Sequence, residues 1–150
     1  MLPVVNQPPH RSAALLDQLA RRMRLRAESV LERFGMRPRH FVALTVLREC
    51  DGCTQQTLTA KLEMDGTNVV GLLNDLEAEN LIERRRSPED RRRHIVQMTD
   101  EGLQRLAKAE FALTAAEEDV LGALDSDQRE TLYQLLQQAV NGRPPARTAE

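Results

Sequence analysis

The sequence contains few aromatic residues: three Phe, one Tyr and no Trp among 150 residues. Sandwiches and barrels of β-strands are enriched in aromatic and β-branched residues, so an all-β fold is not expected. With 41% hydrophobic and 29% charged residues, the composition suits a folded domain whose apolar side chains are mostly aliphatic. We therefore expect a mainly helical protein with an aliphatic core.

Long apolar runs are absent as well. No stretch approaches the roughly 20 consecutive apolar residues of a membrane-spanning helix. Residues 1–11 are rich in Pro and lack the apolar core of a signal peptide. These absences predict a cytoplasmic protein that does not contact a membrane. A chain of 150 residues corresponds to one domain, which we place at residues 12–141 between flexible tails at 1–11 and 142–150.

The chain has no net positive charge, because 21 basic and 23 acidic residues leave a net charge of −2. Clustered positive charge drives binding to nucleic-acid phosphates, so the distribution of the charges is more informative than their sum. Two groups of three consecutive Arg, residues 84–86 and 91–93, flank a short turn with two acidic residues. Between Glu83 and His94 six Arg face three acidic residues, so pairing among them leaves a positive surplus.

Apolar residues recur at helical spacing in six segments, each with start or stop signals. The first segment spans residues 12–34 and ends at Gly35, and the second opens with Pro38 and ends at Asp51-Gly52. The expected N-caps of the other four helices are Thr54, Asp65, Thr99 and Ser126. The side chains expected to face inward on the last helix are Leu132, Leu135, Leu136 and Ala139.

Between the fourth and fifth helices the apolar period changes from helical to alternating, which predicts two short strands at residues 81–86 and 94–99. Two short helices with a tight turn at about residues 54–79, followed by a basic hairpin at about 81–99, are the parts of a winged helix-turn-helix. The predicted fold is therefore mainly α with a small β-hairpin wing.

The second helix of a helix-turn-helix enters the major groove of DNA. The residues that would attach this helix to the core are Val69, Leu72, Leu73 and Leu76. The residues on its opposite face are Thr67, Asn68, Gly71, Asn74 and Asp75. Thr and Asn side chains can bind base edges or phosphates, and Gly71 permits a close approach of the backbone. The alternative is an ordinary solvated surface, but the adjoining basic hairpin favours duplex DNA as the partner.

The wing offers a second set of candidate DNA contacts: Arg84, Arg86, Asp90, Arg91 and Arg92. The guanidinium of Arg92 is the preferred candidate for the narrow minor groove, where the negative potential is enhanced. The carboxylate of Asp90 is expected to hold the loop by accepting from an Arg or a backbone amide. The alternative is a solvated run of charges held by weak local ion pairs.

Four motifs lie between Thr54 and Gly102: Leu62-Glu63-Met64-Asp65, Leu76-Glu77-Ala78-Glu79-Asn80-Leu81-Ile82-Glu83-Arg84, Pro88-Glu89-Asp90-Arg91-Arg92 and Met98-Thr99-Asp100-Glu101-Gly102. Together they closely resemble the MarR family of bacterial transcriptional regulators. The aspartate-any-arginine wing, followed by a hydrophobic residue and Thr, is fairly specific for that family. Asn80 stands where the family usually has Gly, and Met98 where Leu is common. Asn tolerates the left-handed conformation of a helix C-cap.

The resemblance implies a homodimer held by terminal helices at about residues 12–34 and 100–140. Its two recognition helices would bind successive major grooves of a palindromic operator, with the wings in the flanking minor grooves. Carried over residue by residue, the resemblance assigns base contacts to Thr67 and Asn68. The corresponding wing pair is Asp90 and Arg92.

Regulators of this family often respond to small aromatic acids. The expected function is therefore a transcriptional regulator, acting as a repressor that leaves its operator when such a ligand binds or when the protein is oxidised. No ligand-binding residue is assigned. The basic side chains near the first two helices that can meet an anion are Arg22, Arg26, Arg39 and His40.

Cys50 and Cys53 form a Cys-x-x-Cys pair just before the third helix. A thiol near a helix N-terminus can have a lowered pKa, so a redox switch is one interpretation. The favoured interpretation is structural, with Cys50 as a small core residue and Cys53 as a reduced surface thiol. A zinc site needs more ligands than the dispersed His10, His40 and His94 supply, so no metal or other cofactor is expected.

Motifs of enzymes are also missing: the sequence has no phosphate-binding loop, nucleophile elbow or metal-binding helix pair, so catalysis is not expected. The alternative from a different class is a dimeric winged-helix module that binds protein without binding DNA. Salt separates these two functions, because contacts to phosphates weaken steeply with added salt and a mainly apolar protein interface does not.

Overall fold

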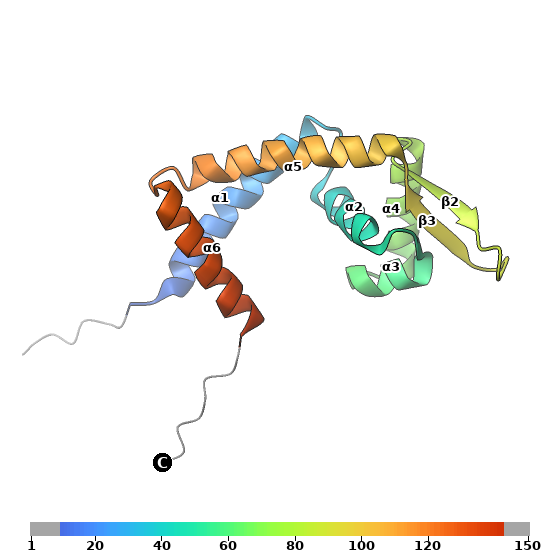
Figure 1. Ribbon diagram of the computed structural model, residues 1–150, viewed down its shortest axis with the longest axis horizontal. Helices are drawn as coiled ribbons and strands as arrows, with labels where there is room; N and C mark the ends of the chain where they lie inside the picture. Colours follow the sequence, from blue (N-terminus) through green and yellow to red (C-terminus); the bar gives the residue numbers. More distant parts are fainter. Residues whose placement is uncertain (1–9, 143–150) are drawn as a thin grey trace, which may run out of the picture.

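Six helices and three short strands make up residues 10–142, the part of the chain that the computed structural model describes (Figure 1). In chain order the elements are α1 (Ser12–Glu32), α2 (Pro38–Cys50), β1 (Cys53–Thr54), α3 (Gln55–Leu62), α4 (Gly66–Ala78), β2 (Ile82–Arg86), β3 (His94–Met98), α5 (Asp100–Val120) and α6 (Ser126–Asn141). The predicted mainly helical fold with a hairpin wing is confirmed. Most of the two expected tails, residues 1–9 and 143–150, lies outside the described residues.

Three of the four expected N-caps are confirmed. Thr54, Asp65 and Thr99 each accept a hydrogen bond from the backbone N–H three residues further on. The prediction of Ser126 is wrong, because the preceding Asp125 caps α6 by accepting from the Gln128 N–H at 2.8 Å. The Gln128 side chain accepts in return from the Asp125 N–H, and this reciprocal capping box favours Asp125.

The core lies between α2, α3, α4, α5 and the sheet, and it is aliphatic as expected. Leu44, Leu58, Leu73, Val96 and Leu106 are completely enclosed. All four residues that were expected to attach α4 to the core are buried there. Helix α4 is therefore held by a continuous apolar stripe, and its other faces are left for solvent or a partner.

The sheet has three antiparallel strands in the order β1-β3-β2, where two were predicted. Strands β2 and β3 form the wing hairpin, with Ile82 opposite Met98 and Arg86 opposite His94. The additional strand β1 has only two residues, and Cys53 pairs there with Val96. Such a strand is too short to show a period in the sequence, so its pairing could not be predicted.

A tight junction connects the end of α4 to the start of α5. Asn80 has a positive φ of 59°, the left-handed conformation expected at this helix end. Thr99 donates its hydroxyl to the Asn80 carbonyl at 2.7 Å while it caps α5. Gly102 lies so close to the Leu81 carbonyl that a Cβ atom would collide with this oxygen. The position of the recognition helix is therefore fixed relative to α5.

The helix α5 runs from the wing to the far end of the molecule, where α1 packs along it and α6 turns back (Figure 1). The expectation that four apolar side chains of α6 face inward is wrong for three of them in a single chain, because only Leu132 is partly buried. Leu135 is 59% exposed, Leu136 and Ala139 are also exposed, and no residue of α6 is buried. The sequence period identifies an apolar face of a helix, but it does not identify what covers that face.

Candidate nucleic-acid interface

The recognition helix α4 presents its predicted face to solvent. Thr67, Asn68, Gly71 and Asn74 are all exposed, on the sides of the helix that do not pack on the core. A Cβ atom added at Gly71 would meet nothing within 4 Å, so this surface is open for another molecule. The helix therefore carries donors, acceptors and free space where a DNA groove would lie.

Two amides on this face are held by neighbouring charges. Asp65 accepts from the backbone N–H of Asn68 at 2.9 Å and from its side-chain Nδ2 at 2.7 Å. Further along the helix, Asn74 uses its Oδ1 to accept from the Arg84 guanidinium at 2.6 Å. Both side chains are consequently ordered before any partner binds.

The four predicted wing arginines fall into two groups. Arg84 is partly buried and donates to both Asn74 and Glu77, with 2.9 Å between its Nε and a Glu77 carboxylate oxygen. The same guanidinium lowers the pKa of the Glu77 carboxyl. Arg84 thus connects strand β2 to the recognition helix. By contrast, the side chains of Arg86, Arg91 and Arg92 are exposed.

The wing tip is shaped by its acidic and hydroxyl side chains. Asp90 accepts from the backbone N–H of Arg92 at 3.0 Å, and its carboxylate lies 3.7 Å from the Arg93 guanidinium. Ser87 is buried, donates its backbone N–H to the Arg93 carbonyl at 2.8 Å and accepts with its hydroxyl from the Glu89 and Asp90 amides. The expected loop-holding role of Asp90 is confirmed, and the Arg92 side chain extends from a defined loop.

A groove of about 410 Å³ lies between the wing tip and the first turns of α3 and α4. The residues that line it are Thr54, Gln55, Gln56, Thr59, Gly66, Arg92, Arg93 and His94. Helix N-termini carry unpaired N–H groups and partial positive charge, which favour anions. The predicted site included only Arg92 from this set. The Thr54 cap marked the start of α3, but the sequence does not show that the wing comes back beside it.

Ion pairs away from the groove connect α5 to α2 and to the end of α4. Arg48 on α2 makes a bidentate pair with Glu110 on α5 at 2.6 and 2.7 Å, which lowers the pKa of the Glu110 carboxyl. Arg105 on α5 pairs with Glu79 at the end of α4 and with Glu101. The recognition helix is therefore coupled to α5 by charged contacts as well as by the Thr99 junction.

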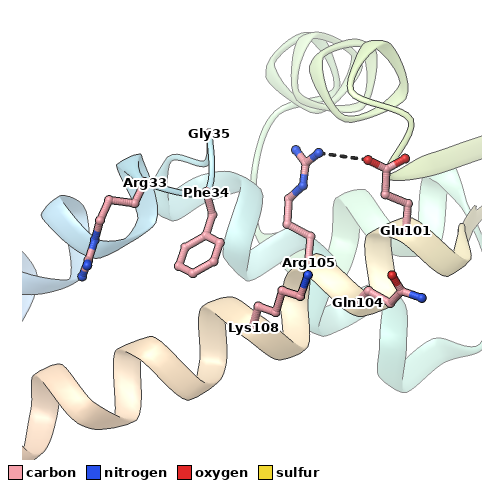
Figure 2. A pocket seen from close by; sticks show the side chains of 7 residues that line it. All are labelled: Arg33, Phe34, Gly35, Glu101, Gln104, Arg105 and Lys108. Carbon is pink, nitrogen blue, oxygen red and sulfur yellow. Dashed lines mark hydrogen bonds and ion pairs between the residues drawn. The ribbon is translucent and has the colours of Figure 1, made fainter.

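A wide cavity of about 750 Å³ opens beside one of these contacts, between the end of α1 and the first half of α5. Figure 2 shows the Phe34 side chain between the backbones of α1 and α5, with Lys108 and Arg105 on α5 and the Arg105–Glu101 ion pair at one side. The residues that line the cavity are Arg33, Phe34, Gly35, Glu101, Gln104, Arg105 and Lys108. It combines an aromatic ring with several cations.

The four basic side chains considered for an anion do not gather in one place. Arg22 and Arg26 border a shallow hollow between α1 and α5, where Arg26 is paired with Asp119 at 2.8 Å. His40 lies in another hollow, where its Nε2 is 3.2 Å from Asp75 on α4. Arg39 is exposed at the start of α2. Phe34 and Lys108 were missed because their proximity depends on the packing of α1 on α5.

The prediction that Cys50 is the core residue and Cys53 the surface thiol is wrong, because the two positions are reversed. Cys53 is the buried thiol, 8% exposed at the start of β1, and Cys50 is the partly exposed one. Burial and a hydrogen bond with the Cys50 thiol raise the pKa of Cys53 to about 11. The lowered pKa considered for a thiol beside a helix N-terminus is therefore not found at Cys53. The pairing of β1 with β3, which the sequence did not reveal, encloses this side chain.

Residues 10–142 contain neither a metal-binding cluster nor a membrane-spanning helix. No cluster of three or more His, Cys, Asp or Glu side chains in this range has the arrangement of a metal site. Within the same range, every helix is too short or too polar to span a bilayer.

The fold and the exposed face of α4 beside an Arg-rich hairpin define a winged helix-turn-helix protein. Residues 34–93 match the sequence model of the MarR family. A putative transcriptional regulatory protein for the hcr operon of Thauera aromatica is 34% identical over 110 residues, or 73% of this chain. The alignment spans 66% of that relative, slightly less than two thirds of its length. The chain belongs to the MarR family.

Solved structures show the same fold at low sequence identity. MarR from Escherichia coli in its apo form matches with a TM-score of 0.78 and 19% identity, covering 89% of this chain and 98% of that chain. A mutant of the same protein in complex with operator DNA has a TM-score of 0.68 and 19% identity, over 85% and 92% of the two chains. BpsR of Bordetella bronchiseptica, whose DNA binding is regulated by 6-hydroxynicotinic acid, has a TM-score of 0.69 and 21% identity, over 91% and 100%.

Proposed function

We propose that this chain is a sequence-specific regulator of transcription that binds a palindromic operator in duplex DNA as a homodimer. The observation that carries the proposal is a single surface on which the exposed face of α4 adjoins an Arg-rich wing with a defined tip. The α4 face fits the major groove, and the Arg92 side chain fits a flanking minor groove. Such a regulator acts in the cytoplasm, where bacterial DNA lies.

The proposed contacts divide into two kinds. Thr67, Asn68, Gly71 and Asn74 face the bases and the adjacent backbone, and they supply sequence readout. Arg86, Arg91 and Arg92, with Asp90 holding the loop, supply charge toward the phosphates and the minor groove. Arg84 acts by fixing Asn74 and joining the wing to α4, because its guanidinium already has two partners.

The homodimer is proposed from the apolar side chains that this chain leaves uncovered. Leu15 and Leu16 on α1 are exposed, Phe111 on α5 is 82% exposed, and Tyr133 and Val140 on α6 are exposed. A large exposed apolar patch usually marks an interface, so we infer that these side chains are covered by a second chain. Pairing of the terminal helices, at about residues 12–34 and 100–140, would cover these side chains and place two α4 helices about one turn of DNA apart, roughly 34 Å.

We further propose that a small aromatic anion binds in the cavity beside Phe34 and releases the repressor from its operator. The ring of Phe34 can pack against an aromatic ligand, and Lys108 can bind its carboxylate. Arg105 lines the same cavity while it holds Glu79 at the end of α4. A ligand that competes for Arg105 would therefore weaken a contact that positions the recognition helix. The response of BpsR to an aromatic acid supports this ligand class.

A titration of duplex DNA from the protein's own upstream region, at two salt concentrations, tests the DNA-binding function. The wild-type protein is expected to bind tightly and to lose affinity steeply with salt, with a slope of about −0.9 for each phosphate contact. Arg92→Ala is expected to bind much more weakly while remaining folded. Arg24→Ala, which removes an exposed Arg from α1, is the matched control. If a folded dimer binds no duplex at either salt concentration, the result would instead support a module that binds protein without binding DNA.

A further inference from the structure

The first turn of α4 fixes the orientation of one exposed amide. Asp65 uses one carboxylate oxygen to cap the helix through the Asn68 backbone N–H and the other oxygen to accept from Asn68 Nδ2, at 2.9 and 2.7 Å. A carboxylate only accepts hydrogen bonds, so the nitrogen of the Asn68 amide must face Asp65. The Oδ1 of Asn68 and its second side-chain N–H remain for another partner.

A second Asn on the same helix, Asn74, is held through its oxygen and not through its nitrogen. Asn74 accepts from Arg84 with its Oδ1 at 2.6 Å, so its two side-chain N–H groups remain. Asn74 therefore keeps two donors and has one of the two acceptor positions of its oxygen filled by Arg84, whereas Asn68 keeps its whole oxygen and one donor. The two exposed amides of α4 are chemically different, although they are the same residue type.

Base pairs differ in what they present in the major groove. Adenine offers the N6 amino group as a donor beside the N7 acceptor, whereas guanine offers two acceptors. Cytosine offers a donor and no adjacent acceptor, and thymine offers an acceptor beside a methyl group. Among the four bases, adenine alone presents by itself both the donor and the acceptor that such an amide needs.

We propose that Asn68 reads one adenine in each half-site of the operator, and that Asp65 is the positioning residue that sets this preference. The inference rests on the proposed function, namely that the chain binds duplex DNA through α4. Asn68 stands in the first turn of α4, and the N-terminal residues of a recognition helix are those that reach base edges. The proposal assigns a second function to the cap, because the Asp65 carboxylate also selects the base.

The test begins with selection of bound duplexes from a randomised pool by the wild-type chain. An adenine is expected at one symmetric position of each half-site. In the selected duplex, that adenine is then replaced by 7-deazaadenine, which lacks the N7 acceptor, or by purine, which lacks the amino group. Each replacement is expected to weaken wild-type binding by about 5- to 150-fold. Asn68→Ala should bind all three duplexes equally.

Two further substitutions separate positioning from folding. Asp65→Asn retains a good N-cap but offers an amide where Asn68 needs an acceptor, so the helix should remain while the preference for adenine falls at least about fivefold. Because this variant also removes a negative charge near DNA, the readout is the ratio of affinities for the adenine and analogue duplexes. Asn74→Ala should weaken binding to all duplexes by the same factor and keep the ratio. Thermal unfolding of each variant confirms that it folds.

The outcomes separate this inference from the function on which it rests. If no duplex is enriched by a folded wild-type dimer, the proposed function fails and this inference fails with it. If a palindrome is enriched without adenine, or if the adenine preference survives Asn68→Ala, DNA binding stands and the assignment to Asn68 is overturned. An unchanged ratio in Asp65→Asn would overturn the positioning role.

Discussion

The two ends of the molecule differ in how completely their side chains are covered. At the wing end, the four core-facing residues of α4 are buried, and its exposed Asn68 and Asn74 amides are paired with charged neighbours. At the other end, α6 buries no residue, and Leu15 on α1 and Leu135 on α6 are largely exposed. At the wing end, the core-facing side chains are covered within one chain. The helical arm, formed by α1, α6 and the adjoining half of α5, leaves apolar side chains uncovered, and we propose that a second chain covers them.

This difference predicts opposite results for similar substitutions at the two ends. Leu73→Ala removes an enclosed side chain of α4 and should lower the free energy of unfolding by about 2 to 5 kcal/mol. Leu136→Ala on α6 removes an exposed side chain and should change the unfolding of the monomer by less than about 0.5 kcal/mol. Chemical unfolding at low protein concentration measures both. Equal losses would mean that the two ends do not differ as described.

The junction between the two ends is the next most sensitive point. Gly102→Ala places a methyl group against the Leu81 carbonyl, so α5 must shift relative to the end of α4. We expect a loss of about 1 to 3 kcal/mol, together with weaker DNA binding. Gly71→Ala, at an open position of α4, is the control for the effect of a glycine substitution on stability alone, because Gly71 also lies on the proposed DNA-binding face. A variant at Gly102 with wild-type melting and binding would show that this contact does not position α4.

A charge introduced into the apolar face of α6 should weaken dimerisation. Leu135→Glu introduces a carboxylate into the proposed interface and should raise the dimer dissociation constant at least about tenfold. Gln138→Glu places the same charge on the same helix outside the apolar stripe and should leave association near the wild-type value. Sedimentation over a concentration series measures both variants. If Leu135→Glu dimerises like the wild type, the interface lies elsewhere.

A smaller effect is expected from the pair that joins α2 to α5. Because Arg48 lowers the pKa of Glu110 in the folded protein, this pair stabilises the fold above the ordinary carboxyl pKa of 4.5, and the contribution is lost as the pH falls through the lower folded-state value. The free energy of unfolding should decrease more steeply below pH 4.5 in the wild type than in Glu110→Gln. Glu118→Gln, an exposed carboxyl on the same helix, should retain the steeper dependence. Parallel pH profiles for the wild type and Glu110→Gln would contradict the assignment.

The smallest expected effect is a difference in alkylation rate between the Cys50 and Cys53 thiols. Because the pKa of Cys53 is raised to about 11 and the side chain is buried, almost no thiolate is present at neutral pH. Iodoacetamide should therefore label Cys50 well before Cys53 in the native protein, and peptide mass spectrometry gives the order. Labelling of Cys53 first would show that the loop before α3 opens.

The sequence predicted most of the wing end because each feature there has a local signal. The caps Thr54 and Asp65, the apolar stripe of α4 and the turn at Asp90 depend on residues a few positions apart. Three other features depend on segments that meet only after folding. They are the strand β1, the groove that Gln56 lines, and the ion pair between Arg84 and Glu77. The burial of Cys53 was assigned wrongly for the same reason. At the helical arm, the apolar period of α6 was recognised, but its partner could not be read from one chain.

The proposed function requires that two chains bind one palindromic duplex through α4 and the wings. Sedimentation of the complex, combined with hydroxyl-radical footprinting of the selected duplex, measures both the stoichiometry and the symmetry of binding. We expect two chains per duplex and a symmetric footprint whose two protected regions lie about one helical turn, or roughly 10 base pairs, apart. A complex with a single chain, or protection without symmetry, would contradict this arrangement.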